Sequence, residues 1–267
     1  MSPAALGDHA AGVPWYAESG ADNGPLLVLV HGTMDRAAGM LPLARRLDER
    51  VDGRLRILRY DRRGYGRSSH LGPFEMEHQV ADLVGLMAGR RAVVVGHSFG
   101  GNVALATAAR HPHLVAGVLA FETPLSWEPW WPRRSTTNAV AASAADAAGA
   151  AEIFMRRLIG DQRWEALPER TRATRRAEGP AMVGELTDAR ERPPWRYADI
   201  TMPLAVACGS RGAEHHRDGM RRLAASVPGS VFAELDGVGH AAPTTDPTQF
   251  VDTLVLPLLE RVGAPWV

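Results

Sequence analysis

Apolar residues recur along the chain in short uninterrupted runs that are separated by longer segments of mixed character. Segments between the runs, at about 41–50, 75–88, 99–110, 215–226 and 247–262, predict helices. The runs themselves have the length and composition of strands covered on both faces, and they lie at 26–30, 55–60, 92–95, 115–121, 204–207 and 231–235. We therefore expect an α/β fold with a doubly wound, mostly parallel sheet and right-handed crossovers, which binds ligands beyond the carboxyl ends of its strands.

One long interval interrupts this alternation. From about residue 123 to 199 no strand-like run appears, and the segment is rich in Ala, Arg and Trp. This pattern predicts a helical cap over residues 125–198, inserted between a first core segment, 1–124, and a second, 199–267. Because the insertion leaves the sheet at the carboxyl end of one strand and returns before the next, we expect it to cover the carboxyl edge of the sheet as a lid. Residues 139–151 are nearly low-complexity, and they fit either a helix or a flexible stretch.

A serine occupies the turn between a predicted strand and a predicted helix. The valine-rich run at 92–95 leads directly into Gly96-His97-Ser98-Phe99-Gly100-Gly101, and an apolar stretch follows. This is the setting of a nucleophile elbow, where the side chain stands clear of the sheet edge. The glycines let the strand and the helix approach each other without Cβ clashes. Ser98 is therefore the candidate nucleophile.

A serine hydroxyl becomes a good nucleophile only when a positioned imidazole removes its proton. Among the ten histidines, His240 fits best, because it follows the last predicted strand through the loop Asp236-Gly237-Val238-Gly239. The order Ser, then His, along the chain matches that of a hydrolase elbow.

An early turn, His31-Gly32-Thr33-Met34, offers backbone N–H groups beside the elbow. We expect the amides of Thr33 and Phe99 to form an oxyanion hole, with Met34 as an alternative donor.

Together these motifs resemble the α/β-hydrolase superfamily over nearly the whole chain. The resemblance is carried by His31-Gly32, by Asp61-Arg62-Arg63-Gly64-Tyr65-Gly66-Arg67-Ser68, by the 96–101 elbow and by Gly239-His240. It implies an eight-stranded sheet with the cap after strand six, and a structural role for the charges at 61–68. Since the elbow holds Ser and not Asp, epoxide-hydrolase and dehalogenase chemistry, which needs an alkyl-carboxylate intermediate, is disfavoured.

The third member of the expected triad departs from the common pattern of this superfamily. The usual acid, three residues beyond the glycine that closes strand seven, falls on Gly212. Some relatives, including those similar to haloalkane dehalogenase, carry the acid after strand six, and Glu122 stands there in this sequence. Glu122 is our first candidate, and a lid-hinge carboxylate paired with an Arg is the alternative interpretation. Glu214 is the second candidate for the acid, ahead of Asp218 and Asp236.

Composition adds few constraints and several exclusions. Thirty basic residues, all Arg, balance thirty acidic ones without a long basic run, which argues against nucleic-acid or membrane partners. The first twelve residues lack the features of a signal peptide, so a cytoplasmic location is expected. The lone Cys208 fits a buried structural thiol.

Three groups of residues have less specific interpretations. The pairs His111-x-His113 and His215-His216 fit surface histidines better than metal ligands. The Arg pairs, including Arg62-Arg63, fit solvated faces. The tryptophans at 127, 130 and 131 fit either a lining of an apolar pocket or packing between lid and core.

The function expected is that of a serine hydrolase that cleaves a compact, apolar carboxylic ester, lactone or thioester through an acyl-Ser98 intermediate. His240 acts as base and then as acid, and neither an organic cofactor nor a metal is required. Two other classes remain open: a ligand-binding or signalling protein that keeps the pocket, and a lyase or cyclase on the same scaffold.

Overall fold

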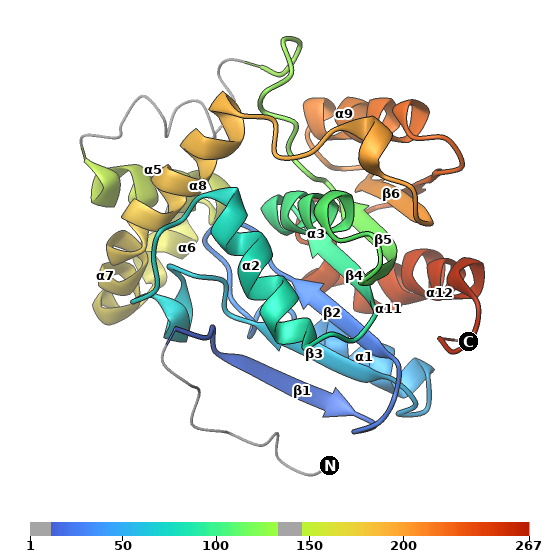
Figure 1. The fold of residues 1–267 in the computed structure, drawn as a ribbon. Coiled ribbons are helices and arrows are strands. Elements are labelled where there is room, and N and C mark those ends of the chain that lie inside the picture. The colour runs from blue at the N-terminus through green and yellow to red at the C-terminus, as the bar shows by residue number, and fades with distance from the viewer. Residues whose placement is uncertain (1–11, 133–145, 267) are drawn as a thin grey trace.

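The computed structural model describes residues 12–132 and 146–266, which fold around one mixed sheet (Figure 1). Seven strands follow the order β1-β3-β2-β4-β5-β6-β7, and only β1 is antiparallel to its neighbour. The strands are β1 (Tyr16–Gly20), β2 (Leu26–Val30), β3 (Arg56–Tyr60), β4 (Ala92–His97), β5 (Val115–Phe121), β6 (Leu204–Gly209) and β7 (Val231–Leu235).

Helices cover both faces of the sheet, as parallel strands require. On the face that looks toward the viewer in Figure 1 lie α2 (Met76–Met87), α3 (Phe99–Arg110) and α9 (Glu214–Ser226). The opposite face is covered by α1 (Leu41–Arg50), α11 (Pro247–Phe250) and α12 (Leu256–Val262), with a π-helical turn at Val251–Val255. A short α10 (Ala242–Thr245) and two 3₁₀ turns, Gly66–Ser68 and Tyr197–Asp199, complete the core.

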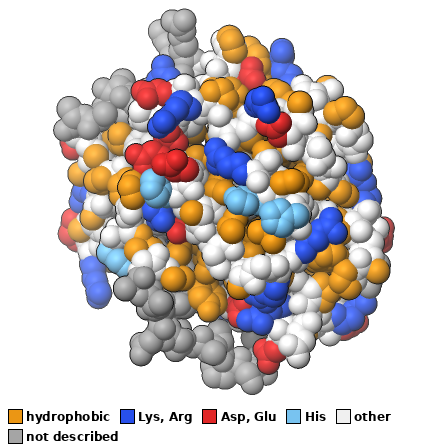
Figure 2. Space-filling model, viewed as in Figure 1, with side chains coloured by type: hydrophobic (Ala, Val, Ile, Leu, Met, Phe, Trp, Pro, Cys, Tyr) orange, Lys and Arg blue, Asp and Glu red, His pale blue; other side chains and the backbone are white. Residues whose placement is uncertain are grey.

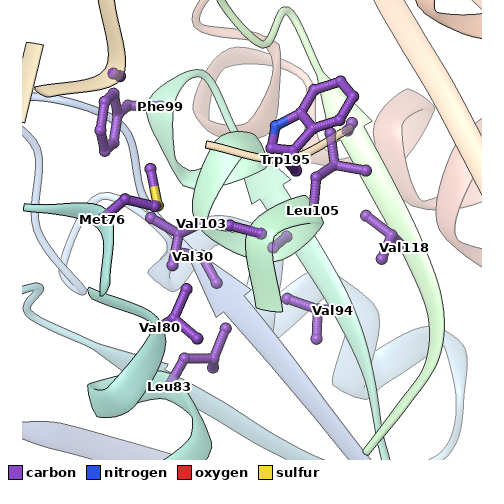
Figure 3. Close-up of a cluster of buried hydrophobic side chains, with 14 of the residues drawn as sticks. Val30, Met76, Val80, Leu83, Val94, Phe99, Val103, Leu105, Val118 and Trp195 are labelled. Carbon is purple, nitrogen blue, oxygen red and sulfur yellow. The ribbon is translucent and has the colours of Figure 1, made fainter. Parts of the chain in front are cut away.

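The central strands are buried because their side chains are apolar on both faces. Figure 3 shows one of the two resulting cores, in which Val30, Val94 and Val118 from three neighbouring strands meet side chains of α2 and α3. All five residues of β2 and all seven of β5 are buried. Burial of this continuous apolar surface, at about 25 cal/mol per Å², is the main force that holds the strand ends in place.

The described part of the interval between β5 and β6 contains four α-helices and no strand. They are α5 (Ala147–Ile159), α6 (Asp161–Ala166), α7 (Glu169–Ala177) and α8 (Gly179–Glu191), and they gather beside the carboxyl end of β2 (Figure 1). We call residues 146–199 the helical insertion. Its first helix includes residues 147–151 of the low-complexity stretch, while 139–145 lie outside the described residues.

The sequence-based expectation of the fold is confirmed, with two differences in the sheet. The resemblance implied eight strands, and the described residues form seven. The strand β1 was missed, because its sequence, YAESG, is short and polar and only its second residue is buried. An edge strand of this kind is held by backbone pairing with β3 and needs no apolar run.

No helix in the described ranges is long and apolar enough to cross a membrane. On the face shown in Figure 2, basic and acidic side chains are interspersed with hydrophobic ones.

Candidate active site

The register of the parallel strands brings the candidate residues to one edge of the sheet. Val30 of β2 pairs with Gly96 of β4, and His97 of β4 pairs with Phe121 of β5, which in turn pairs with Ala207 of β6. These strands therefore end at the same level, and the segments that follow them are neighbours.

Ser98 has the strained backbone of a nucleophile elbow, with φ +54° and ψ −126°. Such a conformation is costly for a residue with a Cβ, and it persists only where the surroundings enforce it. A Cβ added to Gly96 would lie 2.5 Å from the Cα of Gly101, and one added to Gly100 would overlap the carbonyl oxygen of Val30. Both glycines are therefore needed for the tight packing of strand, turn and helix.

His240 and Glu122 form a hydrogen-bonded pair. Nδ1 of His240 lies 2.7 Å from Oε2 of Glu122 and donates to it, because a carboxylate only accepts. The Glu122 side chain is fully buried, and its Oε1 accepts a second hydrogen bond from the backbone amide of Gly209 at 3.0 Å. The geometry leaves Nε2 of His240 as the basic nitrogen. Ser98 and His240 line the same cavity.

The structure explains why a glycine, Gly212, stands at the usual position of the acid. A Cβ at residue 212 would overlap Oε1 of Glu122, so the carboxylate of Glu122 occupies the space that a side chain from this loop would need. Glu122 itself has a left-handed backbone, with φ +45°. The other acidic candidates, Glu214, Asp218 and Asp236, do not line the cavity, and none of them has a hydrogen bond to His240.

The two predicted oxyanion donors flank Ser98. Phe99 is the first residue of α3, so its amide has no acceptor within the helix. Within the described part of the chain, the amide of Thr33 donates no hydrogen bond either. A Cβ added to Gly32 would lie 2.8 Å from the Cβ of Ser98, which shows how closely this turn packs against the elbow.

The turn that carries Thr33 is attached to the helical insertion by a buried carboxylate. Glu185 of α8 is 1% exposed, and the hydroxyl of Thr33 donates to its Oε1 at 2.7 Å. The other donors to Glu185 come from the core: Arg62 (2.6 and 3.2 Å), Tyr65 (2.7 Å) and Gln79 (3.4 Å). A charge at this depth is tolerated because it is paired and hydrogen-bonded several times over.

The interpretation of Arg62 and Arg63 as a solvated pair is wrong. The Arg62 side chain is fully buried against Glu185. Arg63 forms a nearly buried, bidentate ion pair with Asp82, in which both N···O distances are 2.7 Å. Arg62 also donates its backbone N–H to Nε2 of His31, while Nδ1 of His31 donates to the carbonyl oxygen of Gly32. Burial and the adjacent Arg62 hold the pKa of His31 well below its usual value.

Three further histidines surround His240. The ring of His97 lies 4.7 Å from that of His240 and donates from Nε2 to the His240 carbonyl oxygen at 2.8 Å. Burial, followed by the effect of His240, lowers the pKa of His97 to about 3. On α9, His216 lies 5.2 Å from the His240 ring, and burial holds its pKa well below normal. Burial also lowers the pKa of His215.

The expectation that His215 and His216 are surface histidines is therefore wrong. Both are partly buried and line the cavity, because the start of α9 packs beside the loop that carries His240. Among the described residues, no group of three or more His, Cys, Asp or Glu side chains is placed to hold a metal ion. Cys208 is fully buried in β6, and burial raises the pKa of its thiol to about 12.

The cavity has a volume of about 280 Å³ and opens beside Ser98. The helical insertion supplies part of its wall through Phe154, Arg157, Leu158 and Leu186. Of the three tryptophans at the start of the interval, only Trp131 lines the cavity. Trp127 packs against Trp195 instead, with ring centroids 5.4 Å apart.

Sequence reasoning found Ser98, His240 and Glu122, and the structure brings all three to the cavity. It missed Glu185 and His97, and it placed His216 on the surface. His97 immediately precedes Ser98 in the sequence, and this local signal could have identified His97 as part of the site. No local signal marks Glu185, because its partners come from distant segments.

Comparisons with known proteins agree on one family for this chain. Residues 27–253 match the model of the alpha/beta hydrolase family. The chain is 30% identical over 244 residues to the pimeloyl-(acyl-carrier protein) methyl ester esterase of Chromobacterium violaceum, a match that covers 86% of this chain and 93% of the esterase.

Two other similarities are narrower or more distant. Epoxide hydrolase 3 of Xenopus tropicalis is 34% identical over 115 residues, which is 41% of this chain and only 30% of that relative's length. The enol-lactonase of Burkholderia xenovorans superposes with a TM-score of 0.71 at 25% identity, covering 92% of this chain and 96% of the lactonase.

Proposed function

Because this chain belongs to the alpha/beta hydrolase family, we propose that it is a serine hydrolase that cleaves a carboxylic ester, lactone or thioester through an acyl-Ser98 intermediate. The observation that carries the proposal is the 2.7 Å hydrogen bond from His240 to the buried Glu122, with Gly212 leaving room for that carboxylate. Glu122 fixes the imidazole in the tautomer whose Nε2 is a base.

The reaction follows from this arrangement. Nε2 of His240 takes the proton of the Ser98 hydroxyl as its oxygen attacks the carbonyl carbon of the substrate. The amides of Thr33 and Phe99 stabilise the oxyanion, and the new imidazolium gives its proton to the leaving group. His240 then activates a water molecule that releases the acid and restores Ser98. Glu122 stabilises the imidazolium without taking its proton.

The cavity supports a compact substrate. A volume of about 280 Å³ lies just below the usual range of ligand pockets, ~300–1,000 Å³. Its apolar wall is formed by Pro124, Trp131, Phe154, Leu158 and Leu186. The esterase and lactonase among the similar proteins agree with ester or lactone cleavage. Epoxide hydrolysis is disfavoured, because Ser98 stands where that chemistry needs an Asp. It stays a prediction that residues 125–198 form a lid with these boundaries. The cytoplasmic location also stays a prediction.

Pre-steady-state kinetics with p-nitrophenyl acetate tests the proposal. With this activated ester we expect deacylation to be slower than acylation, so wild type should release a burst of about one p-nitrophenolate per protein and then turn over steadily. Ser98→Ala is expected to give neither phase. Steady turnover that survives in Ser98→Ala would contradict the nucleophile, and tight binding of the ester without turnover by wild type would favour a ligand-binding protein.

A further inference from the structure

The cavity beside Ser98 carries more positive than negative charge. Two arginines line it, Arg157 from α5 and Arg211 from the loop after β6. Among the described residues that line it, Glu122 is the one carboxylate, and it is fully buried and engaged by His240. Within this described lining, a ligand therefore meets two arginines and no free carboxylate.

These two arginines lack the partners that neighbouring arginines have. Within the described ranges, Arg157 makes no ion pair or hydrogen bond, and Arg211 reaches only the carbonyl oxygen of Gly237 at 3.4 Å. In the same insertion, Arg156 and Arg176 both bind Glu152, and Arg175 binds Glu178. The helical insertion is thus rich in ion pairs, yet the arginine that faces the cavity is left unpaired.

The α9 side of the cavity adds an unused polar atom. Nδ1 of His216 is buried and has no hydrogen-bond partner among the described residues. Buried polar atoms of this kind nearly always have a partner. Burial holds the pKa of His216 well below normal and so favours the neutral ring, whose Nδ1 donates or accepts one hydrogen bond.

We propose that the substrate carries a carboxylate in addition to the bond that is cleaved, and that Arg157 and Arg211 bind this carboxylate at the mouth of the cavity. The inference rests on the proposed function, since the ester end must reach Ser98. Guanidinium groups bind carboxylates through paired N–H donors, so they select an anionic oxygen group over a neutral one. The apolar residues that line the same cavity suit a short hydrocarbon chain, as in the half-ester of a short dicarboxylic acid.

A matched pair of esters tests the inference. Monomethyl glutarate and methyl 5-oxohexanoate have the same number of non-hydrogen atoms, and a methyl ketone replaces the carboxylate in the second. Their kcat/KM values are measured by methanol release at low ionic strength, for wild type, Arg157→Gln, Arg211→Gln and the double variant. Arg91→Gln is the control, because Arg91 is exposed, makes no ion pair within the described residues, and precedes β4 at the opposite edge of the sheet.

Wild type is expected to favour the acid ester about tenfold or more. Each single substitution should lower this preference about threefold and the double substitution about tenfold, as loss of a solvent-exposed ion pair implies. The preference should also fall as salt is added, and Arg91→Gln should behave as wild type does. Equal kcat/KM values for the two esters in wild type, or a preference that the double variant retains, would overturn the inference.

A binding measurement separates this inference from the proposed function. Calorimetric titration of Ser98→Ala with monomethyl glutarate should show binding that the added Arg157→Gln and Arg211→Gln substitutions weaken. If that binding is found while wild type shows no Ser98-dependent cleavage of either ester or of p-nitrophenyl acetate, the hydrolase proposal fails and the anion site stands. If wild type cleaves both esters equally, the hydrolase proposal stands and the anion site fails. Absence of arginine-dependent binding to Ser98→Ala also contradicts the anion site.

Discussion

The hydroxyl of Thr33 offers a way to disturb the oxyanion hole without removing its backbone donors. Thr33 donates this hydroxyl to the buried Glu185 of α8 at 2.7 Å, and its amide is one of the two proposed oxyanion donors. The substitution Thr33→Val keeps the branched shape and the amide, and it removes only the hydrogen bond. Thr33→Ser keeps the hydroxyl and is the matched control.

The expected losses of stability and of kcat follow from the hydrogen bonds that remain in Thr33→Val. A hydrogen bond to a charged group is worth about 1.5–3 kcal/mol, and Glu185 keeps its bonds from Arg62 and Tyr65, so the free energy of unfolding should fall by about 1–2 kcal/mol. Complete loss of an oxyanion donor costs about 10²–10³ in kcat. Thr33→Val loosens the turn but keeps its amide, so the loss of kcat should be smaller. We expect kcat to fall about tenfold.

The assay is steady-state hydrolysis of p-nitrophenyl acetate, with urea unfolding measured on the same proteins. Thr33→Val should lower kcat with little change in KM, because the oxyanion forms only in the transition state. Thr33→Ser should recover most of the activity. The reasoning is refuted if Thr33→Val retains the kcat of wild type, or if Thr33→Ser is as impaired as Thr33→Val.

Three other substitutions or conditions test neighbouring parts of the site. Glu122→Gln should lower kcat by about 10³–10⁴, as loss of the orienting carboxylate does in other triads, whereas Glu214→Gln should stay near wild type; the reverse order would move the acid to the loop after β6. Gly212→Ala should also lose most of its turnover while remaining folded by circular dichroism, because the new methyl group overlaps Oε1 of Glu122; full activity in this variant would contradict that contact. The folded-state pKa of His97, about 3, lies below the unfolded value of ~6.5, so its contribution to stability is complete above pH 6.5 and is lost as the pH falls toward 3. In urea unfolding, the loss of stability between pH 7 and pH 5 should be about 1–2 kcal/mol smaller in His97→Gln than in wild type, and equal pH dependence in both proteins would contradict this role.

Residues whose environment is set by nearby sequence were the ones that could be predicted. Continuous apolar runs identified β2 and β5 because strands buried on both faces need apolar side chains at every position. Ser98 could be placed because the glycines that permit its turn lie within two residues of it. The departure at Gly212 was also visible, although its cause, the carboxylate of Glu122, required the structure.

Residues whose partners are distant along the chain were misjudged or missed. Arg62 is buried because Glu185 supplies its counter-charge. Glu185 lies 123 residues further along the chain, so a local sequence pattern does not reveal the pair. The surroundings of His216 depend on how α9 packs beside the His240 loop. Both side chains act through tertiary contacts that override the exposure expected of their residue types.

Labelling with a fluorophosphonate, followed by intact mass and peptide mapping, tests the central claim most directly. It requires an activated nucleophile but no knowledge of the substrate. We predict one label per wild-type protein, located on Ser98, absent from Ser98→Ala and lost or greatly slowed in His240→Ala. A folded wild type that takes no label, or a label that maps to another residue, would contradict the account.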